Sequence, residues 1–291
     1  MTLGNKNLVI NYSSAKHSWL KSGGKISNLY KIYNLSDLTD LFLKDKTKEI
    51  PLLVIGNLSN TLIKDEGFKG IGIKLHGDFA NIQIKSDHLL VGAAVLDNFL
   101  SKFCYQKGIS GYEFLYTIPG SIGGNIFMNA GCYNQEIKDK LISVIYYDIN
   151  QSKIFEKNIS DLQFDYRKGF QENNTIILYG KFKISYTDQD NIKSLMQEYD
   201  IIRKQTQPQK VNCCGSIFKN PKNQSAWKLI KSSIDESFYD GPVKLSKKHS
   251  NFFENDPNIS ANSINLFISK IQKRVKEKHN ILLEKELRII D

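Results

Sequence analysis

The sequence predicts an α+β fold. Short apolar runs with the two-residue period of strands and longer runs with a helical period both occur along the 291-residue chain, and they do not alternate as regular βαβ units. A chain of this length buries a sizeable core and suggests two domains, or three small ones. No internal repeat or low-complexity linker marks a boundary between them.

The first third of the chain mixes short strands with helices. A helix over 35–46 has Ser36 as its expected N-cap and places Leu38, Leu41 and Phe42 on one face. We also expect strands at 49–56 and 70–75, a hairpin over 80–94 that turns near residues 86–88, and a helix over 96–108 that ends at Gly108.

The remaining two thirds continue this mixture. The patterns predict strands at 141–149, 153–157 and 176–186, helices at 191–205, 224–233 and 261–279, and a terminal strand at 287–291. The basic run at 270–279 falls on the last of these helices, where we interpret it as a solvated face.

Charge and composition favour a protein that binds anionic ligands. The net charge is +10, with 41% hydrophobic and 24% charged residues. The opening residues lack the apolar core of a secretory signal, and no run approaches the roughly 18 apolar residues of a membrane span, so we expect a cytoplasmic protein. The cysteines have no metal-ligand spacing, so no metal site is expected; they are Cys104, Cys132, Cys213 and Cys214.

Two segments are rich in small and backbone-permissive residues. The first, GNLSNTLIKDEGFKG (56–70), follows a predicted strand, and the second, IPGSIGGNIFMNAG (118–131), has four glycines after Pro119. Such residues let backbone N–H groups approach a phosphate closely. The first segment is also consistent with an ordinary Asx or serine turn. Neither has the GxGxxG spacing after a strand that indicates a Rossmann site.

Three polar residues are candidate catalysts. Arg167, in FDYRKGF, presents a guanidinium suited to a carboxylate or phosphate, or it stacks on Tyr166. Ser216, in CCGSIFKNP, has no GxSxG elbow and no neighbouring histidine, so it is a turn residue or a proton donor rather than a nucleophile. Glu286 lies just before the terminal strand, where an exposed glutamate needs no special role.

The order of these motifs is more informative than any one of them. The GNLSN turn, IPGSIGGNIFMNAG, Tyr-Arg, GSIFKNP and a glutamate before LRIID follow one another as in the UDP-N-acetylenolpyruvoylglucosamine reductase family. The chain resembles that family from about residue 17 to its C-terminus, with IPGSIGGNIFMNAG and GSIFKNP as the most specific parts. It is similar to the compact subtype, which lacks a substrate-covering insertion after Tyr-Arg.

The resemblance implies a fold and its domains. The family has a non-covalent FAD-binding domain of the vanillyl-alcohol-oxidase (PCMH) type, made of two subdomains, and a C-terminal α+β substrate domain. On this chain it implies FAD-binding subdomains at 1–78 and 79–204, a substrate-binding domain at 205–280, and a terminal segment at 281–291 that carries Glu286.

The resemblance also implies a reaction in peptidoglycan precursor synthesis. NADPH reduces FAD, which passes hydride to C3 of UDP-N-acetylglucosamine enolpyruvate, and Ser216 protonates C2 to give UDP-N-acetylmuramate. Arg167 and Glu286 polarise the substrate carboxylate and stabilise the enol-like intermediate, and we expect Glu286 to be protonated or bound through water. The implied FAD contacts are Gly56, Asn57, Leu58, Ser59, Asn60, Pro119, Gly120, Ser121, Gly123, Gly124, Asn129 and Gly131. The implied substrate contacts are Tyr166, Lys204, Lys219 and Asn220.

The implied protein is a bacterial cytoplasmic monomer that binds neither nucleic acid nor membrane. The chain departs from the family pattern at Asn57, Leu58 and Asn125, where small residues are usual, and at Cys213 and Cys214, where serine or alanine is usual.

Two other classes of protein remain open at this point. Another flavoenzyme of the same fold, such as an oxidase of small alcohols, would keep the glycine-rich segments without needing the three candidate catalysts. A basic nucleotide- or nucleic-acid-binding protein is supported by charge alone, since no nucleic-acid-binding motif is present.

Overall fold

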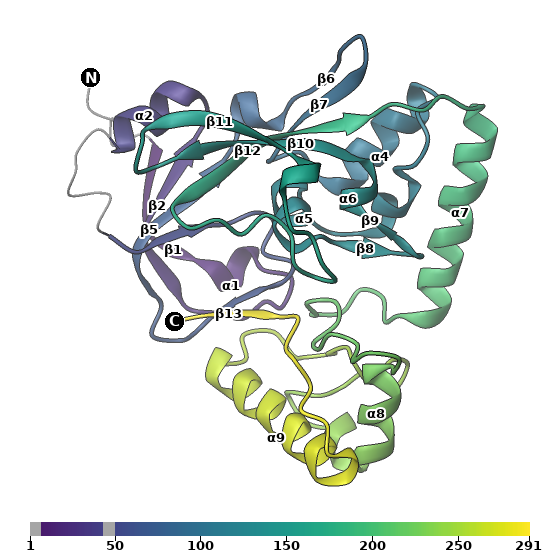
Figure 1. Ribbon diagram of the computed structural model, residues 1–291. Helices are drawn as coiled ribbons and strands as arrows, with labels where there is room; N and C mark the ends of the chain where they lie inside the picture. The colour runs from purple at the N-terminus through teal and green to yellow at the C-terminus, as the bar shows by residue number, and fades with distance from the viewer. Residues whose placement is uncertain (1–6, 43–49) are drawn as a thin grey trace. The chain divides into compact units, whose positions relative to one another are not determined.

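The structure is a computed structural model that describes residues 7–42 and 50–291 (Figure 1). The chain forms two compact units, each assembled from segments that are distant in sequence. The first unit comprises residues 1–10, 28–57 and 70–202, and the second comprises 11–27, 58–69 and 203–291. Helices and paired strands are mixed without regular βαβ repetition, and the predicted α+β class is confirmed. The bounds of the four predicted domain segments stay predictions.

A four-stranded sheet is built from the N-terminal part of the chain. Its order is β1-β2-β5-β3, with β1 (Leu8–Ser13), β2 (Lys25–Ile32), β5 (Phe68–Leu75) and β3 (Leu52–Val54). Strands β3 and β5 are parallel, so Leu52 lies opposite Ile71. The short elements α1 (Ser14–His17) and η2 (Gly77–Ala80) lie between strands in sequence.

The helix predicted over 35–46 is α2 (Leu35–Phe42), and it buries Leu38, Leu41 and Phe42 as expected. The predicted N-cap, Ser36, was wrong. The helix begins at Leu35, and the Asn34 Oδ1 atom, two residues before Ser36, accepts the Asp37 N–H at 2.9 Å. Positions 43–46 of that helix and position 49 of the predicted strand 49–56 lie outside the described residues.

A five-stranded antiparallel sheet organises the first unit. Its order is β11 (Lys153–Asn158), β10 (Leu141–Asp148), β12 (Thr175–Lys183), β7 (His88–Gly92) and β6 (Ile82–Ile84). The four predicted strand segments of this sheet are therefore confirmed, including the hairpin that turns near residues 86–88. Two further predicted helices are α4 (Asp97–Gln106) and α7 (Gln189–Thr206).

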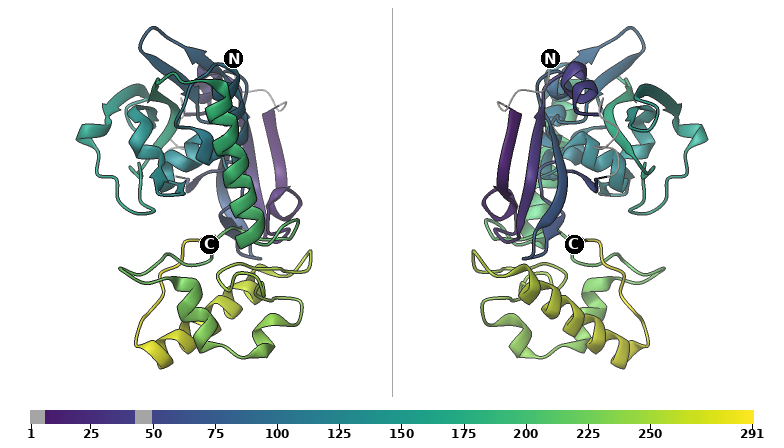
Figure 2. Two further views of the ribbon diagram at one scale, coloured as in Figure 1. Left: turned by 90° about the vertical axis from the view of Figure 1, so that its right-hand side faces the viewer. Right: turned by 90° about the vertical axis from the view of Figure 1, so that its left-hand side faces the viewer.

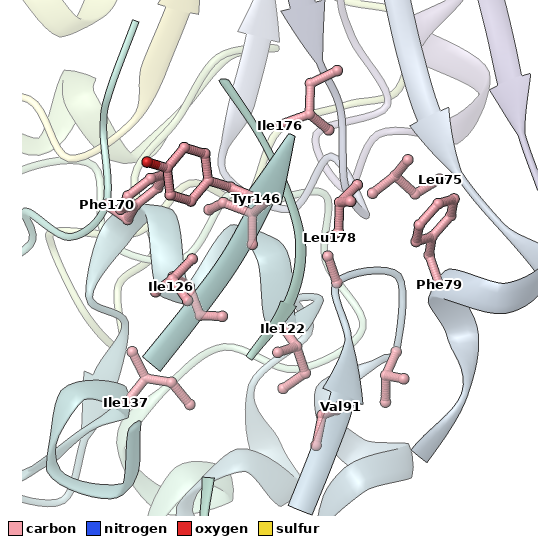
Figure 3. Close-up of a cluster of buried hydrophobic side chains, with 14 of the residues drawn as sticks. Leu75, Phe79, Val91, Ile122, Ile126, Ile137, Tyr146, Phe170, Ile176 and Leu178 are labelled. Atoms are coloured by element: carbon pink, nitrogen blue, oxygen red, sulfur yellow. The ribbon is translucent and has the colours of Figure 1, made fainter. Parts of the chain in front are cut away.

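Helix α5 (Ile122–Met128) packs on this sheet and was not predicted. Figure 3 shows Ile122 and Ile126 of α5 within the same buried apolar cluster as Tyr146, Phe170 and Leu178. Two adjacent glycines hid the helix in the sequence, because glycine disfavours a helix interior by roughly 1 kcal/mol relative to alanine. Nearby short elements are η3 (Glu113–Thr117), β8 (Gly131–Cys132), β9 (Gln135–Glu136), α6 (Ile137–Lys140) and η4 (Ile159–Asp161).

The second unit has its own core. Helix α8 (Ala226–Ser233) lies beside α9 (Ala261–His279), drawn green and yellow in Figure 2, around buried Ile230, Ile264 and Ile268. Strand β13 (Arg288–Ile290) pairs in parallel with β4 (Thr61–Ile63). Both helices and the terminal strand were predicted, and η5 (Glu236–Tyr239) was not. Within 7–42 and 50–291, no helix has the length and apolarity that crossing a membrane requires.

Candidate active site

Within the first unit, the first two residues of GNLSNTLIKDEGFKG contact the second glycine-rich segment. Asn57 Nδ2 donates a hydrogen bond of 2.9 Å to the carbonyl oxygen of Pro119. A Cβ atom built on Gly56 would lie 2.6 Å from Ser121 Oγ. Residues 62 positions apart in the sequence are therefore in direct contact.

The backbone of the first segment has unused donors. Within the described parts of the chain, the amide N–H groups of residues 56–60 donate to no protein acceptor. Leu58 has a left-handed φ of 49° while its side chain is buried. A left-handed residue in a turn directs successive N–H groups to one side, which is how backbone nests bind anions. Leu58 thus holds a conformation that glycine adopts more readily.

The amides of the second segment are mostly satisfied by the protein. Gly120 N–H donates to Asp97 Oδ2 at 2.8 Å. The Ile122 and Gly123 N–H groups donate to carbonyl oxygens just after β7, at 2.9 and 2.8 Å. These hydrogen bonds fix the position of the segment and leave few of its N–H groups to bind a ligand. Its glycines therefore act by letting other groups approach the backbone closely.

Gly124 is the glycine that protein packing does not explain. A Cβ atom on Gly120 would lie 2.5 Å from Asp97 Oδ2, and one on Gly123 would lie 2.9 Å from the Ala93 Cβ atom. A Cβ atom on Gly124 would meet only Ser121 Oγ, at 3.6 Å, an ordinary contact. Alanine would also favour helix α5. Within the first unit, the room beside Gly124 and the unused amides of Gly56 and Asn57 are what a tightly held dinucleotide needs, so the residues present fit FAD.

Asn129 and Arg167 lie at the end of α5. Asn129 closes the helix with a left-handed φ of 46°, and its Nδ2 donates to the Asp165 carbonyl oxygen at 2.9 Å and to Glu136 Oε2 at 3.0 Å. Arg167 donates from a guanidinium nitrogen to the Gly131 carbonyl oxygen at 2.9 Å. Its guanidinium also lies over the Tyr166 ring, 4.9 Å from the centroid, so stacking and contact with the glycine-rich segment coexist.

The second unit brings Ser216 and Glu286 onto neighbouring stretches of chain. Glu286 N–H donates to the Ile217 carbonyl oxygen at 2.8 Å, and Phe218 pairs with Lys285 in a β-bridge. The buried side chain of Asn251 binds both backbone groups of Phe218, accepting its N–H at 3.0 Å and donating to its carbonyl oxygen at 2.8 Å. Asn251 could not be predicted from the sequence, because its partner lies 33 residues away.

Burial and nearby charges shift the pKa values of the two cysteines that precede Ser216 in the sequence. Burial, followed by the charges of Cys213 and Glu286, holds the pKa of the Cys214 thiol well above its ordinary value. The charge of Glu286 thus acts on Cys214, two residues from Ser216. Burial also raises the pKa of Cys213, and the positive charge of Arg203 opposes that shift. Arg203 is thus a cation whose charge acts on Cys213, and no sequence motif includes it.

The predicted substrate residues divide between the units. Lys219 Nζ forms an ion pair of 2.6 Å with Glu284, and the Lys204 carbonyl oxygen accepts a hydrogen bond from Lys248. Asn220 Oδ1 accepts the Ala226 N–H at 2.9 Å and lines a hollow of about 590 Å³ beside α8.

Tyr166, like Arg167, belongs to the first unit. Across residues 7–42 and 50–291, no three His, Cys, Asp or Glu side chains gather as a metal ion would require.

Comparison with known proteins identifies the family. A family model described as "FAD binding domain" matches residues 36–153, and one described as "UDP-N-acetylenolpyruvoylglucosamine reductase, C-terminal domain" matches 207–290. A UDP-N-acetylenolpyruvoylglucosamine reductase of Pelagibacter ubique is 39% identical over 283 residues, covering 96% of this chain and 93% of the relative. The chain belongs to the UDP-N-acetylenolpyruvoylglucosamine reductase family.

Other members of the family agree. The reductase of Rickettsia conorii is 35% identical over 276 residues, covering 94% of this chain and 93% of the relative. The crystal structure of the reductase from Thermus caldophilus superposes with a TM-score of 0.81 at 28% identity and covers 98% of both chains. The resemblance drawn from the motifs is confirmed, and the chain is an FAD-dependent oxidoreductase of this family.

The matched regions divide the candidate residues. The FAD-binding match contains both glycine-rich segments, and the C-terminal match contains Ser216 and Glu286. Arg167 and Lys204 lie outside both ranges.

Proposed function

We propose that this protein reduces UDP-N-acetylglucosamine enolpyruvate to UDP-N-acetylmuramate, with NADPH as the hydride donor and bound FAD as the carrier. The observation that carries the proposal is the direct pairing of the Ser216 segment with the Glu286 segment, in a chain whose relatives bear the reductase name. We propose that it works as a cytoplasmic monomer in peptidoglycan precursor synthesis.

The proposed cofactor residues are the twelve expected from the sequence, and they act in two ways. The free amides of 56–60 bind phosphate oxygens, and the segment 119–131, fixed by its own hydrogen bonds, forms a close-fitting wall with room beside Gly124. FAD bound there supplies the hydride that adds to C3 of the enolpyruvyl double bond.

Ser216 supplies the proton that completes the reduction. As the new C–H bond forms at C3, the Ser216 hydroxyl donates its proton to C2, and the resulting alkoxide regains a proton from solvent. A neutral hydroxyl is a weak acid, so a neighbouring positive charge is needed, and Arg203 lies close enough to affect the pKa of Cys213. Gly215, at a φ of 77°, turns the chain sharply just before the serine.

Arg167 and Glu286 stabilise the negative charge that develops on the substrate carboxylate. A guanidinium provides two parallel donors for this purpose. An ionised Glu286 would repel the same charge, so we propose that Glu286 is protonated or acts through water during turnover.

The remaining proposed contacts serve the UDP-sugar. Tyr166 stands with Arg167, while Lys204, Lys219 and Asn220 contact the sugar nucleotide from the second unit. The Asn220 side chain orders the loop that lines the hollow beside α8. Lys228 also lines that hollow and adds a positive charge suited to a diphosphate.

A Gly124→Ala variant tests the cofactor part of this proposal. Its apo form should be as stable as the wild type or slightly more so, because the protein leaves room for the methyl group. Its FAD affinity, measured by quenching of flavin fluorescence on titrating apo protein, should fall at least tenfold. Unchanged FAD affinity would show that the space beside Gly124 is not used by the cofactor. The reductase part is tested by NADPH oxidation that depends on the enolpyruvyl substrate.

A further inference from the structure

We propose that Asp97 is a positioning residue for the turn at 119–125, acting through Gly120 and Asn125 rather than by touching the cofactor. This inference rests on the proposed role of that turn in binding FAD. It concerns a residue that none of the sequence motifs includes.

Asp97 makes three hydrogen bonds to two residues of the turn. Its Oδ2 accepts the Gly120 N–H at 2.8 Å, and its own N–H donates to the Gly120 carbonyl oxygen at 3.3 Å. Its Oδ1 accepts from Asn125 Nδ2 at 2.7 Å. The carboxylate therefore holds Gly120, before α5, and Asn125, inside α5, in one fixed arrangement.

The same contacts explain two residues of the motif. Gly120 must be glycine, because a Cβ atom there would lie 2.5 Å from Asp97 Oδ2 and 3.0 Å from Asn125 Oδ1. Asn125 stands where the family resemblance leads one to expect a small apolar residue, and its amide is the partner that Asp97 requires.

Ordinary structural roles do not account for Asp97. It is the first residue of α4, yet its side chain does not cap that helix; it bonds to the turn instead. It is completely buried, and within the described residues no cation contributes to its charge state. Burial, opposed by the bonds from Asn125 and Gly120, raises the pKa of Asp97 to about 8. A buried carboxyl without a positively charged partner lowers the stability of a protein. Its presence here therefore indicates that the turn must be held in one position.

The test compares FAD affinity in matched variants of the full chain. Asp97→Ala removes the acceptor for Gly120 and should weaken FAD binding at least tenfold. Asp97→Asn keeps an acceptor oxygen, and Asn125 can turn its amide to match, so affinity should stay within about threefold of the wild type. Glu113→Ala is the control, because Glu113 is also buried and accepts an amide N–H, that of Gly111, away from the turn.

Hydrogen exchange of the apo protein provides a readout that does not depend on FAD. The Gly120 amide should exchange faster in Asp97→Ala than in the wild type or in Glu113→Ala. If Asp97→Ala fails to fold, Asn125→Asp should weaken FAD binding because it removes the amide that donates to Asp97 Oδ1, and the exchanged pair Asp97→Asn with Asn125→Asp should restore it.

The outcomes separate this inference from the proposed function. If wild-type protein fails to bind FAD, the proposed cofactor role itself is overturned, and this inference with it. If the wild type binds FAD but Asp97→Ala binds equally well, or the exchanged pair is no better than Asn125→Asp alone, the positioning role of Asp97 is wrong.

Discussion

Residues around the candidate site owe their identity to different physical causes. A side chain at position 120 would collide with Asp97. A methyl group at position 124 would make an ordinary contact with Ser121. Leu58 and Arg167 both hold left-handed backbone at φ values of 49° and 56°, a strained conformation for residues that are not glycine. Such strain concentrates at functional turns, and both residues belong to the sequence motifs. The residues of the motifs could be identified from the sequence by their types. The tertiary contacts that explain why each of those types is needed could not be predicted.

Ser216→Ala tests the proton donor directly. Reduction of bound flavin by NADPH should be unchanged, while reoxidation by the enolpyruvyl substrate should slow by roughly 10²–10⁴-fold, the usual effect of losing a general acid. Stopped-flow absorbance of the flavin follows both steps. Ser160→Ala, an exposed serine in η4, is the control and should change neither. Loss of both steps in Ser216→Ala would mean that the serine is structural.

Asp97 predicts how stability depends on pH. Burial raises its pKa from 3.8 to about 8 in the folded protein, so between these values the unfolded chain ionises while the folded chain retains its proton. The free energy of unfolding should therefore fall as pH rises through this window, by up to about 1.4 kcal/mol per pH unit from this group. Asp97→Asn should flatten that slope in urea unfolding of the apo protein. An identical slope in both proteins would contradict the assigned proton.

At the level of elements, the sequence pattern predicted most helices and strands, but element length does not separate those it found from those it missed. Helices α7 and α9 matched because each repeats its apolar pattern several times. Strands β1 and β2 were not predicted, although β2 has eight residues. Helix α5 was missed because adjacent glycines disfavour a helix, and β4 because it lies inside a segment that was interpreted as a turn. The predicted N-cap of α2 lies two residues from the side chain that caps the helix. A cap is a single side chain, so no repeating pattern in the sequence locates it.

The turn that carries Arg167 depends on Gly169. The Gly169 and Phe170 N–H groups donate to carbonyl oxygens at the end of α5, at 3.1 and 3.0 Å. A Cβ atom on Gly169 would lie 1.9 Å from the Ile126 carbonyl oxygen, which no side-chain adjustment can relieve. The sequence shows only a glycine after Arg-Lys, and nothing in it indicates that α5 lies against this residue.

Gly169→Ala should therefore separate the Arg167 turn from α5. We expect it to lower the free energy of unfolding by about 1–3 kcal/mol, as overpacking does. The measurement is urea unfolding followed by circular dichroism. Lys168→Ala is the matched control, because the bonds of Lys168 to Asp165 are made by its backbone and survive the change. If Gly169→Ala were as stable as this control, the close packing would be wrong.

On the scale of the whole molecule, both units are assembled from discontinuous segments. Ser216 and Glu286 become neighbours although 70 residues separate them, and Gly56 meets Ser121 across a similar interval. The motif order allowed the family and its candidate residues to be named from the sequence. The neighbours that fix those residues, such as Asn251 and Asp97, could not be predicted, because each acts through one tertiary contact that leaves no local pattern. The net charge of +10 suits a protein whose proposed ligands are all anionic.

The most direct test of the central claim is an anaerobic experiment on the purified holoenzyme. NADPH is added until the yellow flavin absorbance is lost, and UDP-N-acetylglucosamine enolpyruvate is then supplied without oxygen. The reductase account predicts that the oxidised flavin spectrum returns and that UDP-N-acetylmuramate forms in equal amount. A flavin that stays reduced after the substrate is added, or one that NADPH does not reduce, would contradict it.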